Sequence, residues 1–229
     1  MSNNPQIVFS PDETDVQRAV IWLEDENNSQ TEIYHYTAVL ASHPKRNLGI
    51  IKDQNNTLGY VSWSELKNVA QIINIAIEPA SRRKGIGRKL FLGLIRHLKS
   101  TGILATYFNC ASGSDPFWRK MRCRPMPLIS GYSDRPFTTM YLVLVPNQTK
   151  QKITGHGISL FKNGDQADVT WPIKFCPGTT ELLRPIIEPV DLHWRIAATI
   201  NGQQGHALEI VDFQHGATYV EPFLILSHL

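Results

Sequence analysis

The chain of 229 residues lacks the marks of several protein classes. It contains no apolar run of about 20 residues, the length of a membrane-spanning helix, so we expect no membrane span. The first thirty residues lack the basic start and apolar stretch of a secretory signal, which predicts a cytoplasmic protein. Its three cysteines, Cys110, Cys123 and Cys176, are too few and too far apart for a disulfide framework or a C-x-x-C metal pair. We therefore expect no bound metal.

Charge is distributed unevenly along the chain, although the net charge is only +3. Residues 1–80 carry 5 basic and 10 acidic side chains, residues 81–150 carry 13 and 2, and residues 151–229 carry 5 and 8. The basic middle third predicts an anionic partner: a phosphorylated cofactor, a nucleic acid or an acidic protein. A solvated basic surface without a ligand is the alternative.

Apolar periodicity divides the first 146 residues into helices and strands. Ser10 before Pro11 predicts a helix cap, and an apolar helix face continues to about Glu24. The apolar run over 69–77 predicts a strand buried on both faces. The other predicted elements are a weak helix over 34–41, a hairpin of strands 47–52 and 58–63, a helix over 85–99, a strand over 103–109, a short helix over 116–122 and a strand over 138–145.

The last third of the chain has a different character. The polar stretch 146–152 predicts a linker, and Asn163-Gly164 and Asn201-Gly202 are hairpin-turn dipeptides. We predict strands over 194–200, 206–213 and 219–227. The chain is therefore expected to form one domain over 1–148 and a small β-rich domain over 153–229, whose role the sequence does not indicate. Its small size favours packing against the first domain.

The segment from Ile75 to Arg88 carries the strongest chemical signal. A buried strand ends there, and a basic turn with Gly85 and Gly87 opens a helix. The exposed amides of a first helical turn attract anions, and glycines let a phosphate approach the backbone. The segment lacks the G-x-x-x-x-G-K-[ST] and G-x-G-x-x-G motifs. It predicts a diphosphate cradle of another kind, to which basic side chains contribute: Arg82, Arg83, Lys84 and Arg88.

Three motifs resemble the GNAT acetyltransferases. Arg82-x-x-Gly85-x-Gly87 resembles their [RQ]-x-x-G-x-[GA] signature, and 74–79 resembles the strand before it in acetyltransferases of ribosomal proteins. Phe117-Trp118-Arg119-Lys120-Met121 resembles the later F-Y-x-K-x-G-F helix. The resemblance covers about residues 5–146. It implies an α+β fold, a mixed central sheet flanked by helices, and transfer of acetyl from acetyl-CoA to an amine of a protein, peptide or small molecule.

The resemblance also implies how the cofactor binds. The backbone of Ile75, Ala76 and Ile77 is expected to hydrogen-bond the pantetheine arm of acetyl-CoA. The turn that follows is expected to hold the pyrophosphate, with Arg82 at its edge, and consists of Arg83, Lys84, Gly85, Ile86, Gly87 and Arg88.

The family's catalytic groups do not carry over to this sequence. Trp118 stands where many members have an acidic tyrosine, and indole is only a very weak acid. The positions of the base are Gln71 and Ile73, and 107–110 contains no carboxylate. Arg122 replaces the family glycine. For each weaker candidate for the acid or base, an ordinary packing or surface role is the alternative. These candidates are Glu78, His35, His43, the pair Asp191 and His193, Tyr107 and Tyr132. We leave the catalytic acid and base unassigned.

Three functions stay open at this point. The first is an N-acetyltransferase, favoured by the cradle. The second is a non-catalytic scaffold that binds acyl-CoA or a partner, favoured by the missing acid and base. The third uses an aminoacyl-tRNA or another nucleic acid as acceptor, which the basic charge permits but no aromatic-basic pattern supports. Exposed sheet edges allow a homodimer. The length of the acyl chain is not indicated.

Overall fold

The structure, a computed structural model, describes residues 4–29, 34–54, 56–126, 138–145, 155–162, 169–173, 187–191, 193–212, 217–220 and 222–226. The chain divides into two compact units. The first contains Met1–Arg124 and Phe137–Leu144, and the second contains Pro125–Pro136 and Val145–Leu229. The domain boundaries predicted from the sequence stay a prediction.

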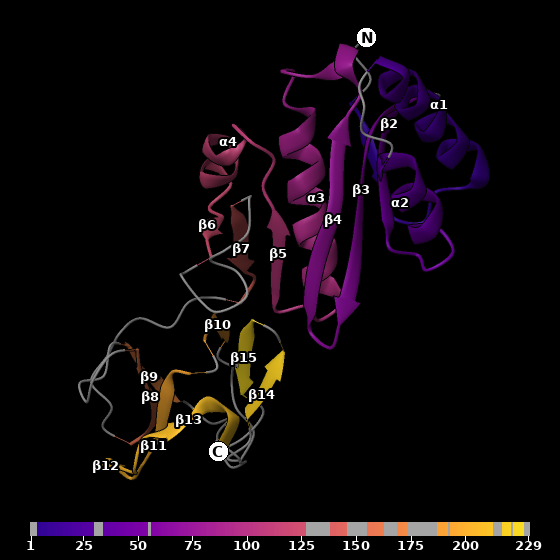
Figure 1. Ribbon diagram of the computed structural model, residues 1–229. Coiled ribbons are helices and arrows are strands. Elements are labelled where there is room, and N and C mark those ends of the chain that lie inside the picture. Colours follow the sequence, from indigo (N-terminus) through magenta and orange to yellow (C-terminus); the bar gives the residue numbers. More distant parts are fainter. Residues whose placement is uncertain are drawn as a thin grey trace. The chain divides into compact units, whose positions relative to one another are not determined.

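The first unit is built on a seven-stranded sheet in the order β1-β2-β3-β4-β5-β7-β6 (Figure 1). β4 and β5 pair in parallel, whereas the pairs from β1 to β4 and the pair of β5 with β7 are antiparallel. The predicted mixed sheet is therefore confirmed. The strands are β1 (Gln6–Val8), β2 (Leu48–Asp53), β3 (Asn56–Leu66), β4 (Val69–Ile77), β5 (Ala105–Asn109), β6 (Arg124–Pro125) and β7 (Thr139–Val143).

Helices flank the sheet and close two apolar cores. On β3, Tyr60 belongs to the core with α1 and Val61 to the core with α3. Successive side chains of a strand point to opposite faces, so the two cores lie on opposite faces of the sheet. None of the described helices is long and apolar enough to cross a membrane. The helices are α1 (Glu13–Ser29), α2 (Tyr34–Ser42), the 3-10 turn η1 (Pro79–Ser81), α3 (Ile86–Ser100) and α4 (Asp115–Lys120).

The predicted start of α1 is wrong. The helix begins at Glu13, and Asp12 caps it, because the Asp12 carboxylate accepts a hydrogen bond from the Asp15 amide at 2.8 Å. Ser10 therefore lies before the helix and does not cap it. The helix also continues to Ser29 rather than Glu24, since neither glycine nor proline interrupts it there.

β4 has the predicted bounds, but the prediction that it is buried on both faces is wrong beyond Ile72. Only Val69, Ala70 and Gln71 pair with β5. Past that point the strand loses this neighbour, so Ile73 is 44% exposed and 74–77 are half-buried. A bulge lies at Ile73, because Trp63 of β3 pairs with Ile72 and the preceding Ser62 pairs with Asn74. The open part of β4 is the part that carries the predicted cofactor residues.

The second unit contains two described sheets, one in the order β12-β11-β8-β9 with β13 paired to β11, and one in the order β10-β15-β14. The predicted turn at Asn201-Gly202 is confirmed, with φ of 52° and 79° between β11 and β12. In the described part of 219–227, the predicted single strand is instead a hairpin of β14 and β15. The described part of 206–213 forms β13 and the 3-10 turn η2. Asn163-Gly164 lies outside the described residues.

The elements of the second unit are β8 (His156–Phe161), β9 (Val169–Ile173), β10 (Ile187–Pro189), β11 (Arg195–Ile200), β12 (Gln203–Gln204), β13 (Leu208–Glu209), η2 (Ile210–Asp212), β14 (Ala217–Val220) and β15 (Phe223–Leu226). Its buried side chains include apolar residues of these strands, such as Ile158, Leu160 and Phe223. The unit is thus β-rich in its described part.

Candidate functional site

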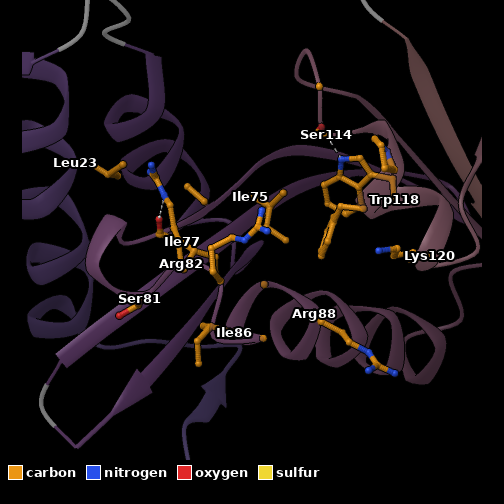
Figure 2. A pocket seen from close by; sticks show the side chains of 17 residues that line it. Leu23, Ile75, Ile77, Ser81, Arg82, Ile86, Arg88, Ser114, Trp118 and Lys120 are labelled. Atoms are coloured by element: carbon orange, nitrogen blue, oxygen red, sulfur yellow. Dashed lines mark hydrogen bonds between the residues drawn. The ribbon is translucent and has the colours of Figure 1, made fainter.

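A cavity of about 830 Å³ opens in the first unit between the end of β4, the start of α3 and α4 (Figure 2). Its volume is in the range of small-molecule sites. The lining residues are Leu23, Ile75, Ala76, Ile77, Ser81, Arg82, Arg83, Gly85, Ile86, Gly87, Arg88, Gly113, Ser114, Pro116, Phe117, Trp118 and Lys120. Nine of the ten residues predicted to bind the cofactor line it, and the tenth, Lys84, is exposed outside it.

On the strand side of the cavity, backbone N–H and C=O groups of β4 can bind a ligand. β4 pairs with β5 only as far as Gln71, and Ile75, Ala76 and Ile77 lie beyond this pairing. On their other side these three residues pair with β3. The edge of β4 that faces the cavity therefore has no strand partner among the described residues. Amides of a ligand can add to this edge as another strand would.

The helix side of the cavity is the first turn of α3. Gly85 is the N-cap, in the left-handed region at φ 80°, and no side chain caps the helix there. The first backbone hydrogen bond of the helix runs from the Lys89 amide to the Gly85 carbonyl. The amides of 86–88 lie before this bond, in the turn whose N–H groups have no partner within the helix. No acidic residue stands in this turn. The amides and the helix dipole thus create positive potential that an anion would stabilise.

The cavity is cationic at this end. Arg82, Arg83 and Arg88 line it together with Lys120 of α4, and the part of the lining that the structure describes contains neither aspartate nor glutamate. The Arg82 Nε atom donates to the carbonyl oxygen of Ile77 at 2.9 Å, which ties this arginine to the end of β4 (Figure 2). A built Cβ on Gly87 would lie 3.5 Å from Ile77 Cγ1, so the missing side chain leaves its space to the cavity.

The α4 side of the cavity combines the aromatic rings of Phe117 and Trp118 with the cationic Lys120. Trp118 is 6% exposed, and its indole Nε1 donates to Ser114 Oγ at 3.1 Å (Figure 2). Ser114 Oγ in turn donates to the carbonyl oxygen of Ala111 at 2.7 Å. Ser114, Phe117 and Lys120 were not predicted as site residues. A tryptophan four residues after a serine that precedes a short helix is the only sequence signal that could have indicated this contact.

The weaker catalytic candidates find other partners. Glu78 is not in the cavity lining, and its carboxylate accepts a hydrogen bond from Ser81 Oγ at 2.7 Å. His43 Nε2 lies 3.0 Å from the Pro11 carbonyl oxygen. The Asp191 carboxylate accepts from the backbone amide of His193 at 3.0 Å, which is a turn contact.

The remaining candidates, Tyr107, His35 and Tyr132, stay predictions. Tyr107 pairs with Gln71 in the sheet, and the side chain of His35 and all of Tyr132 lie outside the described residues. Within the described part of the chain, no group of three or more His, Cys, Asp or Glu side chains could hold a metal ion.

Known proteins share this fold. A model of the acetyltransferase (GNAT) family matches residues 16–121. Ard1 from Thermoplasma volcanium has a TM-score of 0.51 at 18% identity, over 62% of this chain and 99% of its own. The ribosomal-protein-S18-alanine N-acetyltransferase from Escherichia coli has a TM-score of 0.51 at 17% identity, over 65% and 99%. No curated protein sequence gives a match.

A third structure contains a ligand. The N-acetylglutamate synthase from Neisseria gonorrhoeae, complexed with coenzyme A and N-acetyl-glutamate, has a TM-score of 0.50 at 11% identity, over 64% of this chain and 36% of its own. At such identities these likenesses show the fold. Together with the family model they define an acetyltransferase fold, and residues 16–121 are a GNAT-family domain. The predicted resemblance and fold class are confirmed.

Proposed function

We propose that the chain is an N-acetyltransferase that uses acetyl-CoA as its acetyl donor. The observation that supports this most is the division of one cavity into two parts. The start of α3 with Arg82, Arg83 and Arg88 is suited to a diphosphate, and the unpaired edge of β4 is suited to an arm that contains amides. Acetyl-CoA has this order of parts and supplies an activated thioester.

The roles of the residues in this proposal follow from their positions. The amides of 86–88 bind the diphosphate, and the absence of a side chain at Gly87 lets it approach the backbone. Arg82 holds the end of β4 in place through the Ile77 carbonyl. The backbone of 75–77 orients the arm, so catalysis rests on positioning. The acceptor is an amine of a protein, peptide or small molecule.

The test is a calorimetric titration of CoA and acetyl-CoA into the full chain and into Gly85→Asp. Gly102→Asp is a matched control, because Gly102 has φ 83°, no atom within 4 Å of a built Cβ and a place at the opposite end of α3. Both variants therefore meet the same backbone strain and gain the same charge. We expect Gly102→Asp to bind CoA and acetyl-CoA like the wild type and Gly85→Asp to bind them at least about tenfold more weakly. The reason is that the new carboxylate in Gly85→Asp occupies the place of the diphosphate and repels it. Folded wild-type protein that binds neither ligand would contradict the proposal.

A non-catalytic acyl-CoA-binding scaffold is the second candidate. One specific observation favours it: among the described residues, the cavity lining contains no Asp, Glu, His, Tyr or Cys, and the Trp118 N–H is already used by Ser114. Release of CoA thiol from acetyl-CoA in the presence of a mixture of peptide and small amines separates the two candidates. Release that requires an amine supports the enzyme, and binding without release supports the scaffold. A cytoplasmic location, a homodimer and a nucleic-acid acceptor stay predictions.

A further inference from the structure

Trp118, on the α4 side of the cavity, is held in place from several sides. The indole of Trp118 makes aromatic contacts with Phe91, Phe108 and Phe117, at centroid distances of 5.2, 4.4 and 4.8 Å. Its N–H is bonded to Ser114 Oγ at 3.1 Å. A ring enclosed by three aromatic neighbours and one hydrogen bond has no second rotamer to move into without displacing them.

Further contacts hold the hydroxyl of Ser114 in place, so its hydrogen bond fixes the position of the Trp118 indole. Its hydroxyl donates to the Ala111 carbonyl at 2.7 Å and lies 3.1 Å from the sulfur of Cys110. A serine oxygen has one proton to donate and two lone pairs to accept with. With the Ala111 carbonyl, the indole N–H and the Cys110 thiol as partners, the hydroxyl is satisfied in this orientation. Turning the indole would therefore break a network and not one bond.

The orientation of the indole decides which of its atoms face the cavity. Because the N–H points to Ser114, Trp118 presents carbon atoms to the cavity, as Ile75 and Ile77 of β4 do (Figure 2). Arg82, Arg83 and Arg88 line the same cavity beside the start of α3, and Lys120 lines it from α4. If the diphosphate of acyl-CoA binds at the start of α3 and its arm extends along β4 toward α4, the acyl chain meets the indole of Trp118.

Resting on the proposed function, we infer that Trp118 is a specificity-determining residue that limits the donor to short acyl groups, and that Ser114 is its positioning residue. A wall of this kind cannot make room for two extra methylene groups, because interiors are packed as densely as organic crystals. A pocket discriminates about tenfold or more for each methylene that it cannot place. Acetyl-CoA is then accepted and butyryl-CoA excluded.

The experiment measures dissociation constants of CoA, acetyl-CoA and butyryl-CoA by calorimetry for the full-length wild type, Trp118→Leu, Trp118→Phe and Ser114→Ala. Trp22→Leu is the matched control, because Trp22 undergoes the same substitution but does not line the cavity. We expect the wild type and Trp22→Leu to bind butyryl-CoA at least about tenfold more weakly than acetyl-CoA. In Trp118→Leu the two affinities become equal within about threefold, and Ser114→Ala gives an intermediate ratio.

The outcomes separate this inference from the proposed function. Equal affinities for the two acyl-CoAs in the wild type, or an unchanged ratio in Trp118→Leu, overturn the role of Trp118 while CoA binding still stands. An unchanged ratio in Ser114→Ala overturns the positioning role of Ser114. If folded wild type binds no CoA at all, the proposed function fails and this inference with it. Trp118→Phe keeps an aromatic ring in the same core, so it provides the comparison if Trp118→Leu does not fold. In Trp118→Phe we expect the ratio of the butyryl-CoA to the acetyl-CoA dissociation constant to fall at least about threefold. An unchanged ratio overturns the role of Trp118.

Discussion

The ion pair between Asp15 and Lys52 joins α1 to β2, and its loss is expected to destabilise the first unit measurably. Asp15 is 2% exposed, and its Oδ2 lies 2.5 Å from Lys52 Nζ. Its Oδ1 lies 3.8 Å from Arg18 Nη1. The carboxylate also stands in the first turn of α1, where the helix dipole favours negative charge. Asp15→Asn removes this charge with little change in shape.

The magnitude follows from the burial of the two partners. Breaking a fully buried pair costs about 3–5 kcal/mol, and breaking an exposed one costs less than about 1 kcal/mol. Here the Asp15 side chain is 3% exposed and the Lys52 side chain 25%, and asparagine can still accept one hydrogen bond. We therefore expect Asp15→Asn to lower the free energy of unfolding by about 2 kcal/mol. With a urea m-value of about 2 kcal/mol per M, the midpoint falls by about 1 M.

In the assay, urea unfolding is monitored by hydrogen exchange in peptides from 48–66, so that only the first unit is observed. The double-mutant cycle with Lys52→Met isolates the pair, and we expect a coupling energy of at least about 1 kcal/mol. Leu66→Gln, at a residue 63% exposed, is a control that should leave the midpoint unchanged. A loss below about 0.5 kcal/mol in Asp15→Asn, with no coupling to Lys52, would refute the reasoning.

Two further predictions concern titratable groups. Burial lowers the pKa of His97 below its ordinary 6.5, and Glu65 opposes this only in part, so the unfolded chain binds the proton more readily. The melting temperature should therefore fall as the pH drops below 6.5, and less so in His97→Phe; parallel melting curves from pH 8 to 5 would contradict this. Burial, with a contribution from Cys110, raises the pKa of Cys123 to about 12, so the native thiol should resist iodoacetamide at pH 8. Peptide mass spectrometry should find Cys123 labelled only after denaturation, and fast native labelling would show the burial to be wrong.

The regular elements around the site could be predicted from the sequence, because their apolar patterns are long. The repeat of Ile86, Leu90 and Leu94 predicts α3, and the apolar run predicts β4 with the observed bounds. The start of α1 could not be decided this way, since serine and aspartate both cap helices and stand two residues apart.

Irregular backbone limited the prediction of the site. Lys84 lies between Arg83 at φ 66° and Gly85 at φ 80°, where no repeat indicates the direction of a side chain. The role of Ser114 depends on how the segment after β5 folds back to meet Trp118, which is a tertiary contact. In the sequence Trp118 stands out only by the acid that it replaces, because its packing against three phenylalanines is a tertiary feature.

The bulge at Ile73 sets the phase of the strand that follows it. Before the bulge, Ala70 and Ile72 face the core with α3, and after it Ile75 and Ile77 do, an interval of three residues where an unbroken strand has two. Deletion of Ile73 would restore the even interval and keep Ile75 and Ile77 on that face. If the same residues, Ile73 included, ran as an unbroken strand, Asn74 and Ala76 would instead face that core. The cavity wall would then offer an amide and a methyl group in place of two branched hydrocarbons. One inserted residue thus selects which chemistry the cleft presents, without any change in the neighbouring strands.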